Sequence, residues 1–365
     1  MKNKGKLLTY LKVLLSVILI STAVFSIVKR GEECLNLNDP AALAAAAFTL
    51  TDGTYKLNLS NNKQSQSKDT EDKKISETEP KNETAIAQVN KKRDKSGYYD
   101  SFGIHDGENK YDIVENTYGY GGTLVGNSYV KNKTGLDIDF EESLKKNLTF
   151  EVKKNSNEPQ VLIYHTHTSE AYMDEDVDFF YDCFYSRTEN NDFNVVAVGD
   201  AITKSLEDNG IKTLHDKTIH DITYNGSYDR SAETIRSNME KYDSIKVVLD
   251  IHRDAIGTEV QKIKPVFTYN GKKGAQIMIL SGCDTNGDMG FYNWKNNLNF
   301  ALKIQNTAEN LYPDMTRPLS FGYFAYNEYI CDGSLLIEVG TESNSIDEAV
   351  YTGELLGNVL AKVLD

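Results

Sequence analysis

The chain has 365 residues, and its 54 acidic side chains against 40 basic ones give a formal net charge of −14. Binding of nucleic acid needs a basic face, so this balance argues against nucleic acid as a partner. The four cysteines include no Cys-x-x-Cys pair, which argues against a zinc ribbon or a dense disulfide framework. The sequence leaves open whether one disulfide joins two of the last three cysteines.

The first apolar stretch of the chain, residues 7–28, predicts a transmembrane anchor. At about 1.5 Å per residue, a helix of this length spans about 33 Å, close to the hydrocarbon thickness of a bilayer. Lysines are concentrated near residues 1–6, so we expect these residues to form a cytoplasmic tail and the rest of the chain to lie outside. The competing interpretation is a cleaved signal peptide, although Ser26-Ile27-Val28 is a poor cleavage site.

Residues 29–97 have the composition of a tether, because no aromatic residue occurs from Ser60 to Gly97 and aliphatic residues are few there. Such a segment cannot bury enough apolar surface to offset the entropy lost on ordering, so we predict that it is polar and largely disordered. Apolar residues return over residues 98–158. We expect this part to be a partly ordered lead-in that packs against the main domain.

Residues 159–365 are predicted to form one catalytic α/β domain, because strand and helix signals alternate along them. Short apolar runs predict buried strands at 160–165, 211–214, 245–251, 275–280 and 335–339. Apolar residues at helical spacing predict helices from Val195 to Asn209-Gly210, over 231–242, over 292–311, and from a cap at Ser345 onward. This order favours a mostly parallel central sheet flanked by helices.

Side chains of metal-site type gather at three of the predicted strands. VLIYHTHTSE supplies His165, His167 and Glu170, KVVLDIHRD supplies Asp250, His252 and Asp254, and SLLIEVGTES supplies Glu338. In open parallel sheets, binding sites form at the carboxyl ends of strands. A catalytic zinc uses three His or carboxylate ligands, an open position for water, and a separate carboxylate as general base. We therefore predict His165, Glu170 and His252 as zinc ligands and Glu338 as the catalytic base.

Each of these residues also has a structural interpretation. A lone histidine at a strand end is more often a hydrogen-bonded structural residue than a ligand, but three of the six histidines fall at such positions. Glu338 in an apolar strand is costly to bury unless it is paired or functional. Asp250 shares a strand face with His252, which suggests that it orients this ring or has a structural role. His105, His215 and His220 have no such context and are interpreted as surface or packing residues.

Four segments together resemble one known family. VLIYHTHTSEAY, NVVAVGDAI, VVLDIHRDA and LLIEVGTESNS are similar to the stage II sporulation protein P family, and the similarity runs from about Tyr129 to the C-terminus. That family is related to the zinc N-acetylmuramoyl-L-alanine amidases. The resemblance therefore implies Zn2+ as cofactor and cleavage of the amide bond between the lactyl group of the glycan and the stem peptide of peptidoglycan. It also implies endopeptidase action on cross-linked stems.

The resemblance assigns the ligands to His165, Glu170 and His252 and the catalytic role to Glu338. The related amidases have a DPGHGG turn where this chain has YHTHTSE, and alignment by that turn would make His167 the ligand in place of His165. We prefer His165, because its five-residue step to Glu170 fits one loop that closes on one ion. His167 would then orient the site or bind substrate.

Partners and location follow from the resemblance as well. It implies peptidoglycan as substrate, a complex with stage II sporulation proteins D and M, and action outside the cytoplasmic membrane during engulfment in a spore-forming bacterium. Arg253 would pair with a stem-peptide carboxylate or form a structural ion pair. Two other functions stay open: a non-catalytic wall-binding or activator module, and a zinc peptidase that acts only on stem peptides.

Overall fold

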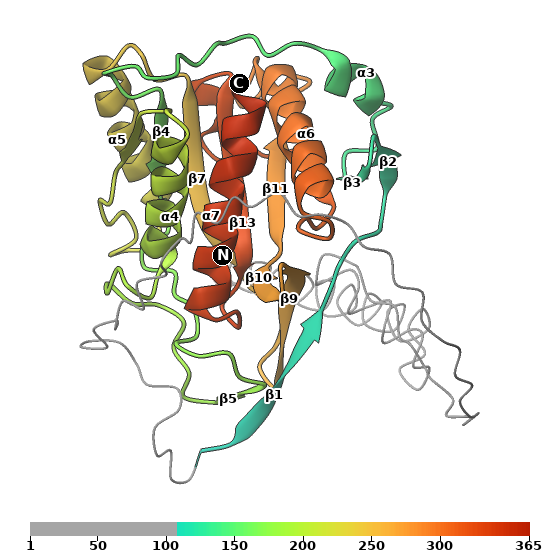
Figure 1. Cartoon of the computed structure of the whole chain (residues 1–365), viewed down its shortest axis with the longest axis vertical. Helices are drawn as coiled ribbons and strands as arrows, with labels where there is room; N and C mark the ends of the chain where they lie inside the picture. Colours follow the sequence, from blue (N-terminus) through green and yellow to red (C-terminus); the bar gives the residue numbers. More distant parts are fainter. Residues whose placement is uncertain (1–107) are drawn as a thin grey trace, which may run out of the picture. The chain divides into compact units, whose positions relative to one another are not determined.

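The computed structural model describes residues 108–365. Within this range the chain forms two β-sheets, and helices cover the larger sheet (Figure 1). The strand order of the larger sheet is β2-β3-β12-β11-β13-β7-β4-β6. These strands are β2 (Thr123–Val125), β3 (Ser128–Asn132), β4 (Val161–Tyr164), β6 (Thr213–His215), β7 (Val247–Asp254), β11 (Ile277–Gly282), β12 (Leu319–Gly322) and β13 (Gly333–Thr341).

Parallel pairing prevails across this sheet, which confirms the predicted α/β class. Strands β6, β4, β7 and β13 run parallel to one another, and so do β11, β12 and β3. The two groups meet where β11 pairs antiparallel with β13, and β2 pairs antiparallel with β3. Strand β3 lies in the region expected to be a lead-in, and it contributes directly to the central sheet.

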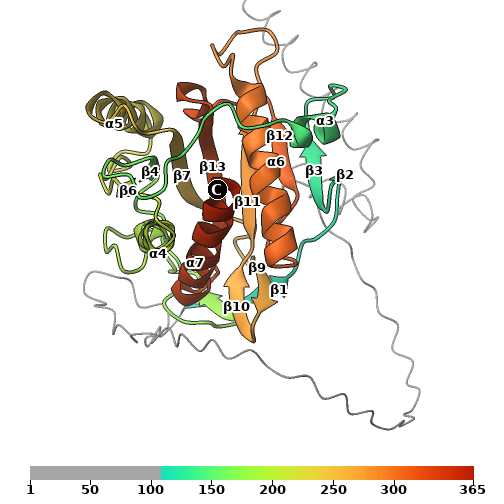
Figure 2. The ribbon, with the colours of Figure 1, turned by 45° about the horizontal axis from the view of Figure 1, so that its top comes forward.

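Four of the helices agree with the predicted ones, with small shifts at their ends, and the short helix α3 (Phe140–Lys145) was not predicted. The four are α4 (Val195–Asp208), α5 (Ser227–Lys241), α6 (Trp294–Leu311) and α7 (Ile346–Val363), and a short 3-10 helix, η1 (Glu328–Ile330), precedes β13. Figure 2 shows α6 and α7 side by side in front of the central strands, with α4 next to α7. Helix α5 packs against β4.

The smaller sheet has no counterpart in the predicted elements. It has the order β10-β9-β1-β5, with the two-residue strand β8 paired to β9. Its strands are β1 (Lys110–Asn116), β5 (Phe179–Tyr181), β8 (Gly257–Thr258), β9 (Gln261–Tyr269) and β10 (Lys272–Ala275). Strand β1 pairs parallel with β9 and antiparallel with β5, so three distant parts of the sequence meet here.

The two faces of the central sheet differ because side chains alternate along each strand. Ile163, Ile251 and Ile337 belong to the large core under α4, α6 and α7. Tyr164 and Val248 point to the opposite face and form a smaller cluster with residues of α5. Only the first face is closed by a large apolar core, which leaves the α5 side of the sheet available for polar side chains.

The predicted cytoplasmic tail (1–6), anchor (7–28) and tether (29–97) lie outside the described residues. Among the helices within 108–365, none combines the length and the hydropathy that crossing a bilayer requires. Cys283 and Cys331 both carry free thiols, so no bridge joins these two residues.

The predicted cap of the last helix is confirmed and gives a direct test of local stability. The Ser345 side chain accepts a hydrogen bond from the Glu348 backbone N–H, and the Glu348 side chain accepts one from the Ser345 backbone N–H. We expect Ser345→Ala to lower the free energy of unfolding by about 1 kcal/mol, the usual cost of losing such a cap. Chemical denaturation measures this, with Lys362→Ala in the last turn as a control that should change little.

Candidate functional site

His252 and Glu338 are neighbours across two parallel strands. The register of β7 and β13 pairs the Cα of Glu338 with that of His252 and the Cα of Leu336 with that of Asp250. Paired strands lie about 4.8 Å apart, so both functional side chains leave the sheet at the same level. Ile251, between Asp250 and His252, points into the large core. Asp250, His252 and Glu338 therefore share the α5 side of the sheet.

His252 lies between two carboxylates. Its Nδ1 is 3.3 Å from Glu170 Oε2, and its Nε2 is 2.8 Å from Asp250 Oδ1, a short but poorly aligned contact that leaves Nε2 without a proper hydrogen bond. Burial alone would lower the pKa of His252, but the charge of Asp250 and its contact with the ring raise this pKa well above its usual value.

Glu170 follows β4 and is buried, with 6 % of its surface exposed. Its Oε2 accepts a hydrogen bond from the Arg253 backbone N–H at 3.2 Å, and its Oε1 lies 3.8 Å from Arg187 Nη2. Although burial would raise the pKa of Glu170, the His252 contact and the charge of Arg253 lower this pKa to about 2. Glu170 is thus a carboxylate at all ordinary pH values.

His167 joins this group from the loop after β4. Its ring lies edge-on to that of His252 at a centroid distance of 5.3 Å, and it stacks on Tyr224 at 4.7 Å with an interplanar angle of 5°. Burial lowers the pKa of His167, and the charge of His252 adds to this effect. The Nδ1 atom of His167 is buried and has no hydrogen-bond partner among the described residues.

Glu338 is partly exposed, although its Oε2 atom is buried and without a hydrogen-bond partner within 108–365. Burial, together with the charge of Asp254, raises the pKa of Glu338 to about 8, and His252 opposes this rise. A carboxyl group with a raised pKa that also reaches solvent can accept and return a proton.

His165 points away from this group. It occupies the next position after Tyr164, so the alternation of β4 directs its ring to the α4 side of the sheet. There its Nδ1 donates to the Ile251 carbonyl at 2.8 Å, and its Nε2 lies 2.8 Å from His215 Nε2. His215 in turn contacts Asp200 of α4 at 2.9 Å. Burial lowers the pKa of His165 to about 3, so the ring is neutral.

Asp250 and Arg253 support the loops around the site. Asp250 accepts hydrogen bonds from the Thr166 backbone N–H at 2.8 Å and from the Thr166 hydroxyl at 2.6 Å, which fixes the turn after β4. The buried Arg253 donates to the carbonyl oxygens of Ala171 at 3.2 Å and Ser186 at 2.8 Å. Its guanidinium therefore holds the segment between Glu170 and α4 in place.

Two groups near the site had no signal in the sequence pattern. Tyr224 is 63 % exposed and stacks on His167, and Tyr228, at the start of α5, contacts the edge of the same ring at 5.7 Å. Arg187 pairs with the buried Asp221 at 2.7 Å. Exposed aromatic residues in loops follow no periodic pattern, so their proximity to His167 is visible only in the three-dimensional structure.

The donor atoms of this site suit a divalent transition metal. Two ligands of one tetrahedral zinc are separated by about 3.4 Å, given metal–ligand bonds of about 2.0–2.2 Å. The 3.3 Å between His252 Nδ1 and Glu170 Oε2 matches that separation, and Asp250 lies at the other ring nitrogen, where a metal-binding histidine usually has a carboxylate. Buried nitrogens of His167 and His252 and a buried oxygen of Glu338 have no hydrogen-bond partner within 108–365. The possible ligand atoms of His167, Glu170 and His252 do not all lie within 4.8 Å of one another. To bind the same ion as the other two residues, His167 would have to turn its ring toward them.

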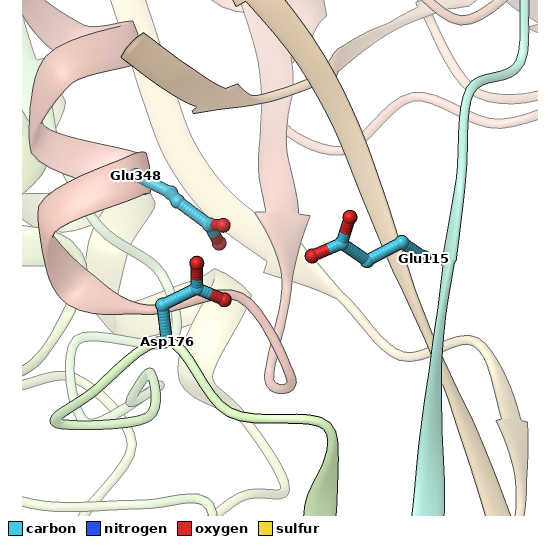
Figure 3. A group of neighbouring side chains, drawn as sticks. All are labelled: Glu115, Asp176 and Glu348. Carbon is cyan, nitrogen blue, oxygen red and sulfur yellow. The ribbon is translucent and has the colours of Figure 1, made fainter.

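One group of carboxylates within residues 108–365 does converge this closely, away from His252. Figure 3 shows Glu115 of β1, Asp176 of the loop before β5 and Glu348 of α7 with their carboxylates facing one another. The ammonium groups of two lysines already occupy the space between them: Lys264 contacts Asp176 and lies 3.2 Å from Glu115 and 3.7 Å from Glu348, while Lys273 lies 2.5 Å from Glu115. We interpret this group as an ion-pair network that fastens the smaller sheet to α7.

The fold and the site together define an α/β protein with histidines and carboxylates gathered on one face of a mostly parallel sheet. The family model described as Stage II sporulation protein P (SpoIIP) matches residues 32–361, and the chain belongs to this family. No curated protein matches the sequence.

Among solved structures, those similar to this chain include several N-acetylmuramoyl-L-alanine amidases. AmiC2 of Nostoc punctiforme has 11 % identity and a TM-score of 0.30, with 57 % of this chain and 96 % of that chain covered. Ami1 from Mycobacterium smegmatis has 13 % identity and a TM-score of 0.32, with 58 % and 97 % covered. The CwlD amidase from Clostridioides difficile, solved in complex with the GerS lipoprotein, has 13 % identity and a TM-score of 0.33, with 56 % and 98 % covered. At such TM-scores these likenesses carry no weight for activity.

The ion-pair network predicts a stability effect that depends on pH. Lys264 is buried, so Lys264→Met should lower the free energy of unfolding by about 2–3 kcal/mol at pH 7, less than for a fully buried pair because two partner carboxylates are partly exposed. Despite some burial, the two lysines lower the pKa values of Glu115 and Asp176. Their stabilisation is therefore present above the unfolded-state pKa values near 4 and is lost as the pH falls through the lower folded-state values.

Denaturation of the wild type and Lys264→Met at a series of pH values checks this, and the difference between them should shrink below about pH 4. Lys273→Met is the matched control: its side chain is 41 % exposed, so its loss should cost below about 1 kcal/mol. Equal costs for both variants would contradict the central position of Lys264.

Proposed function

We propose that the protein is a zinc-dependent peptidoglycan hydrolase, an N-acetylmuramoyl-L-alanine amidase that cleaves the bond between the lactyl group of the glycan and the stem peptide. One observation carries the proposal: the parallel register of β7 and β13 sets Glu338 beside His252, and Glu170 approaches the same histidine at 3.3 Å. Membership of the stage II sporulation protein P family supports it. Glu338 is the catalytic residue in this proposal.

His167, Glu170 and His252 are the residues that we propose to hold the zinc ion. This set departs from the sequence-based expectation at one position, because His167 replaces His165. The reason is the alternation of β4, which turns His165 toward His215 and leaves both of its ring nitrogens in hydrogen bonds. His167, by contrast, contacts the His252 ring. Asp250 would orient His252, and Arg253 would hold the loop that carries Glu170.

When bound, zinc would polarise the scissile carbonyl and acidify a water molecule. Glu338 accepts the proton of the attacking water and then passes it to the nitrogen of the leaving stem peptide. Its raised pKa suits both steps, because the carboxylate is basic enough to take a proton and the acid is strong enough to return it. Glu170, with its low pKa, stays anionic throughout and serves as a fixed negative charge.

We further propose that the enzyme works outside the cytoplasmic membrane on septal peptidoglycan during engulfment, held by the apolar segment 7–28. Stage II sporulation proteins D and M are the partners that the family resemblance implies. The acidic composition of the chain argues against nucleic acid as a partner.

The ligand assignment is tested by metal content. His167→Ala and His252→Ala should lose most of their zinc on dialysis, because each removes one of three ligands. His165→Gln is the matched control, since it changes a buried histidine two positions away and should keep its zinc. Elemental analysis by mass spectrometry, with circular dichroism to verify folding, measures the outcome. Loss of zinc from His165→Gln with retention by His167→Ala would reverse the assignment.

The catalytic assignment is tested by turnover and by products. Glu338→Gln should keep its zinc and fold but lose at least about 100-fold in rate, since a general base normally contributes 10²–10⁴. Mass spectrometry of digested peptidoglycan identifies the bond that is cut. Intact stem peptides with a new amino terminus at L-Ala support an amidase; cut stems alone would indicate a peptidase, and no products a binding module.

A further inference from the structure

The segment between β12 and η1 contains two residues in a strained backbone conformation. Tyr326 has φ +36° and Asn327 has φ +62°. Asn tolerates the left-handed region, but for a bulky aromatic residue this conformation is rare and costs free energy. Such strain persists only where the surrounding structure enforces it, and it is concentrated at functional sites.

Hydrogen bonds after Tyr326 and close packing before it enforce its conformation. The buried Asn327 donates from Nδ2 to the Tyr228 carbonyl at 3.0 Å and to the Ser231 hydroxyl at 3.0 Å, which ties the segment to α5. Glu328 accepts a hydrogen bond from the Gly282 N–H at 3.0 Å. A Cβ atom at Gly282 would lie 2.0 Å from the Phe324 carbonyl oxygen, so the segment packs directly on the end of β11.

The ring of Tyr326 packs against aromatic residues that extend to His167 of the candidate metal site. It lies 4.9 Å from Phe324 and 5.3 Å from Tyr228, and Tyr228 contacts His167. Tyr326 is 38 % exposed, and its hydroxyl has no hydrogen-bond partner within the part of the chain that the structure describes. Burial raises the pKa of Tyr326, and the charge of Glu338 adds to the rise, so the phenol keeps its proton.

We propose that Tyr326 is a further catalytic residue whose hydroxyl donates a hydrogen bond to the carbonyl oxygen of the scissile amide. This inference rests on the proposed amide hydrolysis. The scissile carbonyl must lie beside the ion that His167 would help to hold. Tyr326 packs on Tyr228, and Tyr228 packs on the ring of His167, so the phenol belongs to the aromatic group on that side of the site. Negative charge develops on that oxygen as water adds to the carbonyl, and a donor fixed beforehand stabilises it without reorganisation.

The surroundings explain why a phenol suits this position. Glu170 and Asp250 are buried carboxylates with lowered pKa values, so an amide oxygen that gains negative charge near them needs a donor. A lysine or arginine at position 326 would pair with one of these carboxylates, whereas a phenol stays neutral and keeps its proton available. The strained backbone, fixed by Asn327, holds the ring so that little conformational freedom is lost when substrate binds.

The test compares Tyr326→Phe with Tyr323→Phe in the full-length protein. Tyr323 lies in the same segment and is 53 % exposed, so it is the matched control for loss of one phenol. Tyr326→Phe keeps the ring contacts and should lower kcat about 10- to 100-fold, with KM and zinc content within about twofold of the wild type. Tyr323→Phe should leave all three within about twofold.

A binding measurement supplies a readout that does not depend on turnover. The probe is a phosphinate in which tetrahedral phosphorus replaces the scissile carbonyl carbon of a lactyl-alanine amide and a methylene group replaces the amide nitrogen. Calorimetry should show about 10-fold weaker binding to Tyr326→Phe than to the wild type, and unchanged binding to Tyr323→Phe. The unfolding temperatures of both variants should match that of the wild type. If the Tyr326 hydroxyl had a structural role, Tyr326→Phe would unfold at a lower temperature.

The outcomes separate this inference from the proposed function. If the wild type cleaves the amide and Tyr326→Phe matches it in both cleavage rate and affinity for the phosphinate, the role of Tyr326 alone is overturned. A rise in KM without a fall in kcat would also overturn it, because it would mean ground-state binding only. A zinc-loaded wild type that neither cleaves peptidoglycan nor binds the phosphinate overturns both proposals.

Discussion

The parallel pairing of β7 with β13 is the constraint on which the candidate site depends, because it sets His252 and Glu338 at one level of the sheet. The large core under α4, α6 and α7 maintains this register: Ile251 and Ile337 are fully buried there, on the face opposite the two functional side chains. A slip of one residue in either strand would exchange its apolar and polar sides. The same core packing that stabilises the fold therefore aligns the site.

The site concentrates charge in a region that water hardly reaches. Glu170, Asp250 and His252 are each less than a tenth exposed, and Arg253 is buried beside them. Removing such groups from water is costly unless opposite charges and hydrogen bonds compensate. Contacts between His252 and the two carboxylates, and hydrogen bonds from Thr166 and Arg253, supply part of that compensation. A divalent cation bound by His252 and Glu170 would complete it.

The sequence predicted those features that depend on local pattern. Apolar runs located β4, β7 and β13, helical spacing located α4 and α7, and Ser345 was recognised as a cap. His165 illustrates the limit. Tyr164 of β4 pairs with Asp250 of β7, so these two side chains lie on the same face of the sheet. His165 is the next residue and therefore lies on the opposite face. Strict alternation from this pairing would have favoured His167 as the ligand. The register itself, however, is a tertiary property.

Other features had no local signal at all. Strands β1, β5 and β9 come from three distant parts of the chain, and β9 contains Lys264 and Pro265, which weaken its strand pattern. The pairing depends on tertiary charge contacts, since Lys264 is surrounded by carboxylates from β1, α7 and the loop before β5. Tyr326 gave no signal either, because its left-handed conformation is imposed by Asn327 and Gly282 from outside the residue.

The smaller sheet also fixes the segment that follows Glu338 in the chain. At the end of β13 and just after it, the hydroxyls of Thr341 and Ser343 both donate to the Ile263 carbonyl of β9 at 2.9 Å, and Asn344 donates to the Pro265 carbonyl at 3.2 Å. Glu348 then serves two purposes, since it completes the cap of α7 and faces Lys264. A site on two strands requires that both strands be anchored beyond their ends, because small shifts of a catalytic group are costly. The core anchors β13 from one side of the sheet, and β9 anchors the segment at its end, so the position of Glu338 depends on both sheets.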